Sequence, residues 1–266
     1  MEYTWKPESD GGTDVVGDAP VLISSFPSAG LATTVAGHYI IRALNLPRVG
    51  RFESPESAPI AVIQDGKVSP TVRVYGRPGL ALVLSEFPPT PAQANSIART
   101  ILAGAQARKA RLAICLEGVV PHPTDDDPTG TPSGGKPSAV EQVWSAFSRH
   151  DPDLVKSFES ARVRVLEDGV IGGVSGALLV QAIGGTVPVA VLLVSANAAE
   201  GLPDHRAGAA LIETLDRLLP ELKIDTGPLR AQAEMIEKAL RAAMRRRPEA
   251  APPEEEEPPT SPGMYG

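Results

Sequence analysis

Residues 187–194 read VPVAVLLV, and this run restricts the fold more than any other part of the chain. Valine is among the residues that favour strands, and a strand with one solvated face alternates apolar and polar side chains. No such alternation occurs here. The run therefore predicts a strand that is buried on both faces, as in a parallel sheet with helices on either side.

Strand and helix signals alternate along the rest of the chain, which predicts an α/β domain with a largely parallel sheet flanked by helices. Asn45 and Pro47 stop the first helix, Pro91 opens the second, and Pro248 ends the last. Strands are expected at 21–23, 60–63, 71–75, 80–84, 112–116 and 163–165, and helices at 31–44, 91–108, 204–219 and 228–247.

Two more helix predictions rest on local patterns. Ser138 with Glu141 fits a capping box, which predicts a helix that carries the apolar residues of 143–147. Residues 169–185, GVIGGVSGALLVQAIGG, predict a glycine-rich turn into an apolar helix. We expect the glycines at the start of this helix to let it pack closely on the sheet.

The chain is expected to contain three segments. Residues 1–18 are polar and rich in Gly and Asp, which predicts a flexible N-terminal lead. Residues 19–247 form a single α/β domain, in which 121–137 lacks apolar periodicity and is expected to be a mobile loop. Residues 248–266 are rich in Pro and Glu, so we expect a disordered, extended tail. This tail ends in Met264-Tyr265-Gly266.

Composition excludes several classes of function. The net charge is −7, but five of the acidic residues lie in the tail, so the remainder is nearly neutral and lacks the basic face of a nucleic-acid-binding protein. Cys115 is the only cysteine, which excludes an internal disulfide and a cysteine-based zinc site. Residues 1–19 lack a signal-peptide core, and no uncharged apolar run approaches ~18 residues. We expect a cytoplasmic protein without membrane association or cofactor.

Several turns of the predicted sheet carry polar residues at the edge where ligands bind in α/β proteins, beyond the carboxyl ends of the strands. Ser28-Ala29-Gly30 precedes a helix and could present backbone amides to an anion. The alternative is a tight turn that needs small residues, since neither GxGxxG nor GxxxxGK[ST] occurs. The candidate pocket residues are Ser24, Ser28, Gly30, Glu86, Glu117 and Asn197.

Two other kinds of site can be assembled from the sequence. Ser24 with His38 or His205 and an aspartate would make a hydrolase triad, but no GxSxG elbow accompanies it. His122 with residues 125–127, all Asp, would make a metal site, but the Pro/Gly-rich surroundings suit a solvated run better. We therefore expect neither a catalytic triad nor a metal site.

The last predicted helix, 228–247, carries a heptad seam. Such a seam either docks on its own domain or pairs with another subunit in a homo-oligomer. The helix ends where the Pro/Glu spacer begins. The seam consists of Leu229, Ala233, Ile236, Leu240 and Ala243, at spacings of 4, 3, 4 and 3.

Five segments, taken in order, resemble the proteasome assembly chaperone family, the archaeal and bacterial relatives of the second eukaryotic assembly chaperone. Together they cover roughly residues 20 to 245, and their order and spacing carry the resemblance. The segments are SFPSAGLATTVAGHYIIRAL (25–44), ALVLSEFPP (81–89), ICLEG (114–118), GVSGALLVQAIGG (173–185) and PDHRAGAALIETLDRLL (203–219).

The resemblance implies an α/β fold like that of purine nucleoside phosphorylases, usually without enzymatic chemistry. It also implies homo-oligomers, and in some archaeal members a C-terminal hydrophobic-Tyr-any motif that enters pockets between α-subunits of the 20S proteasome. On that pattern Met264 is the hydrophobic residue, Tyr265 the tyrosine and Gly266 the carboxylate-bearing end. The resemblance therefore predicts a proteasome assembly chaperone or activator.

An enzyme remains the alternative hypothesis. A nucleoside phosphorylase-like or hydrolase-like protein would use the pocket at the strand ends, near residues 24–28, Glu86 and Glu117. A third hypothesis is a structural oligomer whose tail is inert. The sequence does not distinguish an activator from an assembly chaperone, and it does not fix the number of subunits.

Overall fold

The structure, a computed structural model, describes residues 2–8, 15–55, 57, 59–64, 66–120, 141–197 and 202–246. Two compact units divide the chain, Met1–Ala233 and Glu234–Gly266. The predicted loop 121–137 and the predicted tail 248–266 lie outside the described residues. Among the residues described, no helix is both long and apolar enough to cross a membrane.

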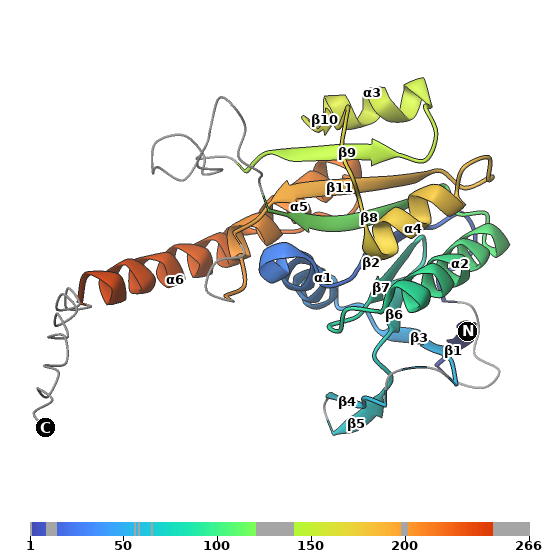
Figure 1. Cartoon of the computed structure of the whole chain (residues 1–266), viewed down its shortest axis with the longest axis horizontal. Helices are drawn as coiled ribbons and strands as arrows, with labels where there is room; N and C mark the ends of the chain where they lie inside the picture. Colours follow the sequence, from blue (N-terminus) through green and yellow to red (C-terminus); the bar gives the residue numbers. More distant parts are fainter. Residues whose placement is uncertain are drawn as a thin grey trace, which may run out of the picture. The chain divides into compact units, whose positions relative to one another are not determined.

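The first unit is built on one mixed sheet of nine strands. These are β1 (Thr4–Pro7), β2 (Val21–Ser25), β3 (Arg48–Glu53), β6 (Arg73–Arg77), β7 (Leu80–Leu84), β8 (Leu112–Val119), β9 (Val143–Phe147), β10 (Arg164–Val165) and β11 (Val189–Ser195). Their order is β1-β3-β6-β7-β2-β8-β11-β9-β10 (Figure 1). The four strands β7, β2, β8 and β11 are parallel, and antiparallel pairs extend the sheet on both sides. A separate hairpin joins β4 (Val62–Gln64) to β5 (Lys67–Ser69).

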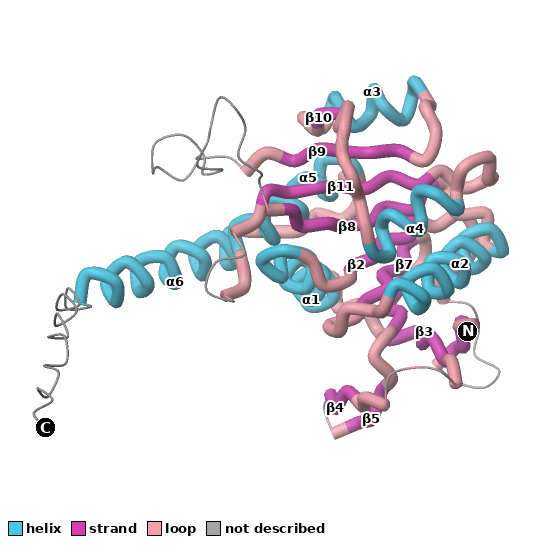
Figure 2. Tube along the Cα trace, viewed as in Figure 1, coloured by secondary structure: helices cyan, strands magenta, loops and turns pink. Residues whose placement is uncertain are grey.

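Helices cover both faces of this sheet (Figure 2). On one face lie α1 (Ala32–Ala43), α3 (Pro152–Ser160) and α5 (His205–Leu218), which share a core with alternate strand residues. On the other lie α2 (Pro91–Ala107) and α4 (Gly173–Gln181), which share a second core. The remaining helix, α6 (Gly227–Arg246), begins in the first unit and ends in the second.

The strand that the sequence predicts at 187–194 is β11, and it is buried on both faces. Ala190, Leu192 and Val194 point into the core with α1 and α5. Val189 and Val191 point into the core with α2 and α4. The predicted α/β class is therefore confirmed, with four parallel strands in the middle of the sheet, antiparallel pairs on either side of them, and a parallel pair of β9 and β10 at one edge.

The predicted helix over residues 143–147 is wrong, because these residues form β9. Val143 and Ser145 are buried while Trp144 and Ala146 are partly exposed, which is the period of two that a strand requires. Hydrogen bonds to β11 in antiparallel register, with Val143 opposite Val194, outweigh the local helix signal. The helix of this region comes later, as α3, where the Asp151 side chain accepts hydrogen bonds from the amides of residues 153 and 154.

The glycines before α4 do not all serve close packing on the sheet. A Cβ added at Gly172 or Gly173 would meet no atom within 4 Å, so both positions face open space. Gly173 instead adopts a φ of +62°, which favours glycine. At Gly176 a Cβ would lie 2.1 Å from the Ile171 carbonyl oxygen, so the close approach is to the preceding loop.

The N-terminal segment differs from the predicted flexible lead wherever it is described. Residues 4–7 form β1, which pairs antiparallel with β3, and Tyr3 is buried. Trp5 packs beside Phe52, with ring centroids 5.7 Å apart, and beneath the Arg108 guanidinium, 4.3 Å from the ring centroid. Contacts with α2 and β3 therefore hold β1 in place. The two aromatic residues that make these contacts, Tyr3 and Trp5, lie in a segment whose composition is otherwise polar.

Gly104 of α2 should be intolerant of a methyl group. A Cβ there would lie 2.4 Å from Trp5 Cε3, so Gly104→Ala must displace the indole. We expect a loss of about 1–3 kcal/mol in the free energy of unfolding by urea and a red shift of tryptophan fluorescence. Ala103→Ser, on the exposed side of the same helix, is the control. A stabilised Gly104→Ala protein, as helix propensity alone predicts, would contradict this packing.

Candidate functional site

The predicted tail residues Met264, Tyr265 and Gly266 lie outside the described residues, so their role stays a prediction. The structure does place the six candidate pocket residues, all of them near the edge where the parallel strands end. It also shows how the start of α6, which leads towards the tail, is held on the first unit.

Gly30 lies in a 3-10 turn, Ala29–Leu31, between β2 and α1, with a φ of +60° that favours glycine. Its carbonyl oxygen accepts a hydrogen bond of 2.7 Å from the Asp204 amide. A Cβ at this position would lie 2.7 Å from the Asn197 carbonyl oxygen. The backbone amide of Asn197 in turn donates a hydrogen bond to Asp204 Oδ2 at 2.8 Å. The turn is therefore a close backbone contact with the segment between β11 and α5.

Ser28 is tied to its neighbours within the protein. Its Oγ accepts a hydrogen bond of 2.9 Å from the Gly118 amide and lies 3.1 Å from Thr33 Oγ1. Thr33 Oγ1 donates to the Phe26 carbonyl oxygen. There is no space for a side chain at Gly118, because a Cβ would come within 2.4 Å of the Ala29 carbonyl oxygen. These contacts favour the tight-turn interpretation of the segment that includes Ser28 and Gly30.

Glu86 follows β7, and its carboxylate contacts one arginine and one histidine. The buried Arg73 of β6 donates to Glu86 Oε1, and His38 Nε2 of α1 lies 2.9 Å from the same oxygen. Burial acts to raise the pKa of Glu86, but the hydrogen bonds from His38 and Arg73 outweigh it and lower the pKa to about 2. The carboxylate thus neutralises an arginine that is only 1% exposed.

Glu117 lies on the opposite face of the sheet, near the start of α4. Its Oε2 accepts a hydrogen bond of 2.7 Å from Ser175 Oγ. Burial raises the pKa of Glu117 to about 7, and the Ser175 bond only partly offsets this. Ser24 is buried on the same face and hydrogen-bonds Cys115, whose pKa burial raises to about 12.

The six residues therefore share an edge of the sheet without forming one set. Ser28, Gly30 and Asn197 belong to contacts around α1 and α5, whereas Ser24 and Glu117 face α2 and α4. His38 pairs with Glu86, and His205 Nδ1 lies 3.0 Å from the Pro203 carbonyl oxygen, so neither ring is bonded to Ser24 among the described residues. No group of three or more potential metal ligands occurs among the described residues. The predicted metal candidate at 122–127 falls outside them.

Sequence reasoning missed Arg73 and Ser175, which pair with the two candidate glutamates. Neither has a local signal, because Arg73 is 13 residues from Glu86 and Ser175 is 58 residues from Glu117. A charged residue within the apolar strand segment 71–75 was the one available hint for Arg73, since buried arginine is rare without a partner.

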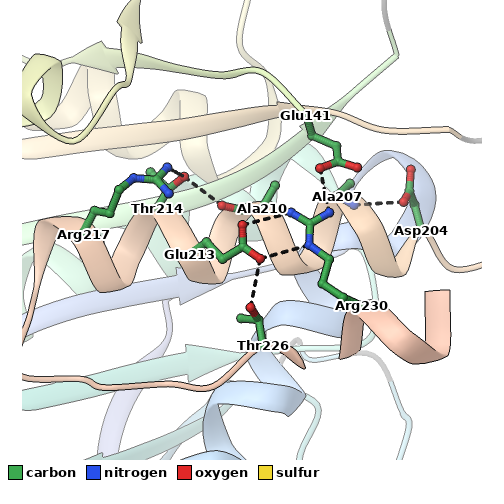
Figure 3. A network of polar contacts seen from close by, with 9 residues as sticks. All are labelled: Glu141, Asp204, Ala207, Ala210, Glu213, Thr214, Arg217, Thr226 and Arg230. Carbon is green, nitrogen blue, oxygen red and sulfur yellow. Dashed lines mark hydrogen bonds and ion pairs between the residues drawn. The ribbon is translucent and has the colours of Figure 1, made fainter. Parts of the chain in front are cut away.

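The start of α6 is clamped by Arg230 (Figure 3). Its Nε and Nη2 donate to Glu213 of α5, both at 2.9 Å, and its Nη1 donates to Glu141 at 2.8 Å. Thr226 Oγ1 adds a hydrogen bond of 2.9 Å to Glu213. Leu229 is buried beside this network. Two-point pairing of guanidinium with carboxylate fixes orientation as well as distance, so the first turn of α6 is set on α5.

The same clamp shifts the ionisation of both partners. Burial acts to raise the pKa of Glu213, but the hydrogen bonds from Arg230 and Thr226 hold it below its usual value. The hydrogen bond to Glu213 raises the pKa of Arg230. Each group therefore stabilises the charged form of the other, as expected of a partly buried ion pair.

The geometry defines the class of this protein: an α/β domain with a mixed nine-stranded sheet between two helical layers, whose last helix leads into a separate C-terminal unit. Its strand-end carboxylates are paired internally. The chain belongs to the PAC2 family, whose sequence model matches residues 22–244. The resemblance to the proteasome assembly chaperone family is thereby confirmed.

Similar proteins share most of this chain's length. An uncharacterised protein of Methanocaldococcus jannaschii, MJ0106, is 28% identical over 222 residues, 84% of each chain. Pyrococcus furiosus PbaA, described as an archaeal homolog of proteasome-assembly chaperone, has a TM-score of 0.74 and 24% identity over 92% of both chains. Pyrococcus furiosus PbaB, described as an archaeal proteasome activator, has a TM-score of 0.72 and 21% identity over 91% of this chain and 99% of that one. These two crystal structures show the same fold.

Glu117 should make stability fall as the pH rises. Its pKa is about 7 in the folded protein against a usual 4.5, so the folded state binds the proton more tightly. The free energy of unfolding therefore declines between about pH 4.5 and pH 7, by on the order of 3 kcal/mol. Glu117→Gln, which still accepts from Ser175, should remove this decline and exceed the wild type in stability at pH 8.

Urea unfolding at several pH values measures this difference. Glu159→Gln, at an exposed glutamate of α3, is the matched control and should differ from the wild type by a constant amount. Parallel curves for Glu117→Gln and wild type between pH 5 and pH 8 would show that Glu117 does not carry the effect.

Arg230→Met should loosen the start of α6. The substitution keeps an apolar stem but leaves Glu141 and Glu213 facing each other without a cation, which should cost about 1–3 kcal/mol of unfolding free energy at pH 7. Arg230→Lys should lose less, because a lysine retains the charge without the two-point geometry. Arg99→Met, at an exposed position of α2, is the control. An Arg230→Met protein within 0.5 kcal/mol of wild type, roughly the scale of a neutral surface change, would contradict the clamp.

Proposed function

We propose that this chain is a proteasome-binding protein, acting as an assembly chaperone or as an activator. Membership of the PAC2 family carries the proposal, because the matched region spans residues 22–244. The fold shared with PbaA and PbaB supports it, since one is described as a homolog of a proteasome-assembly chaperone and the other as a proteasome activator. On this proposal the 20S proteasome is the partner, and the protein acts in the cytoplasm.

The proposed contact is the C-terminal end of the chain. The Gly266 carboxylate pairs with a lysine in a pocket between 20S α-subunits, which is a charge-assisted hydrogen bond. Tyr265 buries its ring and donates its hydroxyl, while Met264 adapts to an apolar wall. This is the capture of a peptide end by its carboxylate. The Pro-rich spacer has less entropy to lose than a Gly-rich one, which favours binding.

One short tail binds weakly, so the proposal includes a homo-oligomer that presents several tails at once. Helix 228–247 supplies a seam for such contacts. Leu229 and Ala233 are buried within the first unit, so the start of the seam is used inside one chain. The later seam positions, Ile236, Leu240 and Ala243, are the ones we assign to a subunit contact.

On this proposal the protein acts by binding and is not an enzyme. Ser28, Glu86 and Glu117 sit at the edge where a nucleoside phosphorylase-like pocket was expected, yet each is bonded to another residue of the protein. A general base or a ligand contact requires a group that can reach the substrate. These internal pairs support a binding role over catalysis.

Deleting residues 264–266 should abolish most of the binding to 20S particles. In a pull-down with purified 20S proteasome, we expect at least a tenfold loss of capture for the deletion and for Tyr265→Ala, because both remove the buried ring. Met264→Leu should bind nearly as the wild type does, since an apolar contact is kept. Equal capture by wild type and deletion would overturn the role of the tail.

Two readouts on the same samples separate activator from chaperone. An activator raises peptide hydrolysis by mature 20S particles, and the deletion loses that rise. A chaperone leaves hydrolysis unchanged and raises the yield of assembled particles from separate subunits. Absence of both effects together with absence of capture would overturn the proposed function as a whole.

A further inference from the structure

A pocket of about 350 Å³ opens at the amino edge of the sheet, opposite the edge where the candidate residues lie. It lies where the neighbouring parallel strands β7, β2 and β8 begin, and the segment that follows α5 forms its other side. Pockets that bind small molecules measure about 300–1,000 Å³, so this one has room for a small ligand. We call it the amino-edge pocket.

The floor of the amino-edge pocket is apolar. Val21 and Leu80 are the first residues of β2 and β7. Leu219 and Leu222 come from the segment that follows α5. These four side chains are at most 4% exposed, so the floor is firmly packed from below. Gly79, in the turn between β6 and β7, has a φ of +80° and no atom within 4 Å of an added Cβ, so no side chain narrows the pocket there.

Two arginines on the rim converge on one acidic residue. Arg77, at the end of β6, donates from Nη2 to the Glu221 backbone carbonyl oxygen at 3.4 Å. Arg111, just before β8, donates from Nη2 to Glu221 Oε1. The hydrogen bond from its own backbone amide, together with Arg111 and Arg77, lowers the pKa of Glu221 although burial acts to raise it. Two positive charges and one negative charge leave this part of the rim with a net charge of +1.

The carboxylate of Glu221 can be displaced from Arg111 at small cost. Both side chains of this pair are 53% exposed. An exposed ion pair contributes little to stability, because water solvates the two charges when they separate. A guanidinium also binds a carboxylate at two points when the carboxylate is free to orient. An external carboxylate can therefore take the place that Glu221 now occupies.

We propose that the amino-edge pocket binds a small monocarboxylate with an apolar body. The carboxylate of this ligand lies between Arg77 and Arg111 in place of that of Glu221, and its apolar body rests on the floor, where it is removed from water. A phosphate monoester fits less well, since it carries about −1.5 to −2 charges at pH 7. The group that the rim already holds is a carboxylate with a single charge.

This site goes beyond the proposed function and does not depend on it. All residues that form the amino-edge pocket belong to the first unit, and none lies in the C-terminal segment that we propose binds the proteasome. Binding is therefore measured on the full chain alone, in the absence of 20S particles. Its failure would leave the proteasome proposal intact, and the reverse is also true.

Three related compounds test the ligand class. The probe is 3-phenylpropanoate. The comparison compounds are 3-phenylpropan-1-ol, which keeps the apolar body without the charge, and 2-phenylethyl phosphate, which replaces the head group. In an amide NMR titration of the full chain at pH 7, we expect a dissociation constant on the order of 1 mM for the acid and roughly tenfold weaker binding of the other two. The amides of Ala19 and Gly79 should shift, and that of Glu159 on α3 should not.

Each other result of this titration would overturn a named part of the proposal. Equal binding of acid and alcohol would show that the arginines hold no carboxylate. Tighter binding of the phosphate would show that the head group is wrongly assigned. No binding of the acid up to about 10 mM, roughly ten times the expected constant, would remove the site. Shifts that leave Ala19 and Gly79 unchanged would do the same.

Substitutions on the rim give a second test with effects in opposite directions. Arg77→Gln and Arg111→Gln should each weaken binding of the acid roughly fivefold, because each removes a charge-assisted hydrogen bond. Glu221→Gln should strengthen it roughly threefold, because the competing carboxylate is gone. Loss of folding cannot produce such a gain. The alcohol, which contacts only the floor, should respond to none of the three.

The matched controls are Arg99→Gln and Glu159→Gln, at exposed positions of α2 and α3, and neither should change the affinity for the acid. A Glu221→Gln protein that binds the acid no better than the wild type would contradict the displacement. Equal losses for Arg99→Gln and Arg111→Gln would show a general effect of charge in place of a site.

Discussion

The pairing of β11 between β8 and β9 is the interaction on which the rest of this structure depends. Seven residues of β11 are in parallel register with β8, and five of them also face β9 in antiparallel register. Burial on both faces means that its backbone groups find no water, so these ladders must satisfy them. The chain enters β11 from α4 and leaves it for α5, which fixes these two helices on opposite faces of the sheet.

The carboxyl edge of the sheet follows from that pairing. After β11, the Ala196 amide donates to the Val119 carbonyl oxygen at 2.9 Å. Further along the chain, the Asp204 amide donates to the Gly30 carbonyl oxygen at 2.7 Å. Glycines at 30 and 118 allow the backbones to approach closely. The edge where many α/β proteins hold a ligand is here occupied by the protein's own contacts.

The sequence predicted those parts of the fold whose signal lies within one segment. The unbroken apolar run of β11 and the proline that opens α2 each identify their element without help from elsewhere. β9 was mistaken for a helix because a five-residue strand offers little alternation, and its decisive contact, with Val194, is far away in sequence. Likewise, Trp5 packs against Gly104, which is far away in the sequence. Composition alone does not reveal this contact, so the N-terminal segment was expected to be flexible.

The candidate site shows the same limit more strongly, because its chemistry depends on pairs. Glu86 and Glu117 were both chosen from the sequence as carboxylates at strand ends, and nothing local distinguishes them. Arg73 and His38 hold one of them ionised, whereas burial beside Ser175 favours the protonated form of the other. Opposite pKa shifts for the same residue type arise from neighbours on β6, α1 and α4, which only the folded chain brings together.

Two side-chain polar contacts of this protein lie at the starts of α4 and α6. Glu117 lies against the start of α4, and Arg230 binds two carboxylates at the start of α6. Burying such groups costs free energy unless they are paired, whereas an apolar contact would hold a helix without that cost. What a paired arginine adds is orientation, since its two-point geometry permits one arrangement of donor and acceptor. The first turn of α6 is therefore oriented on α5 more strictly than apolar packing alone would achieve.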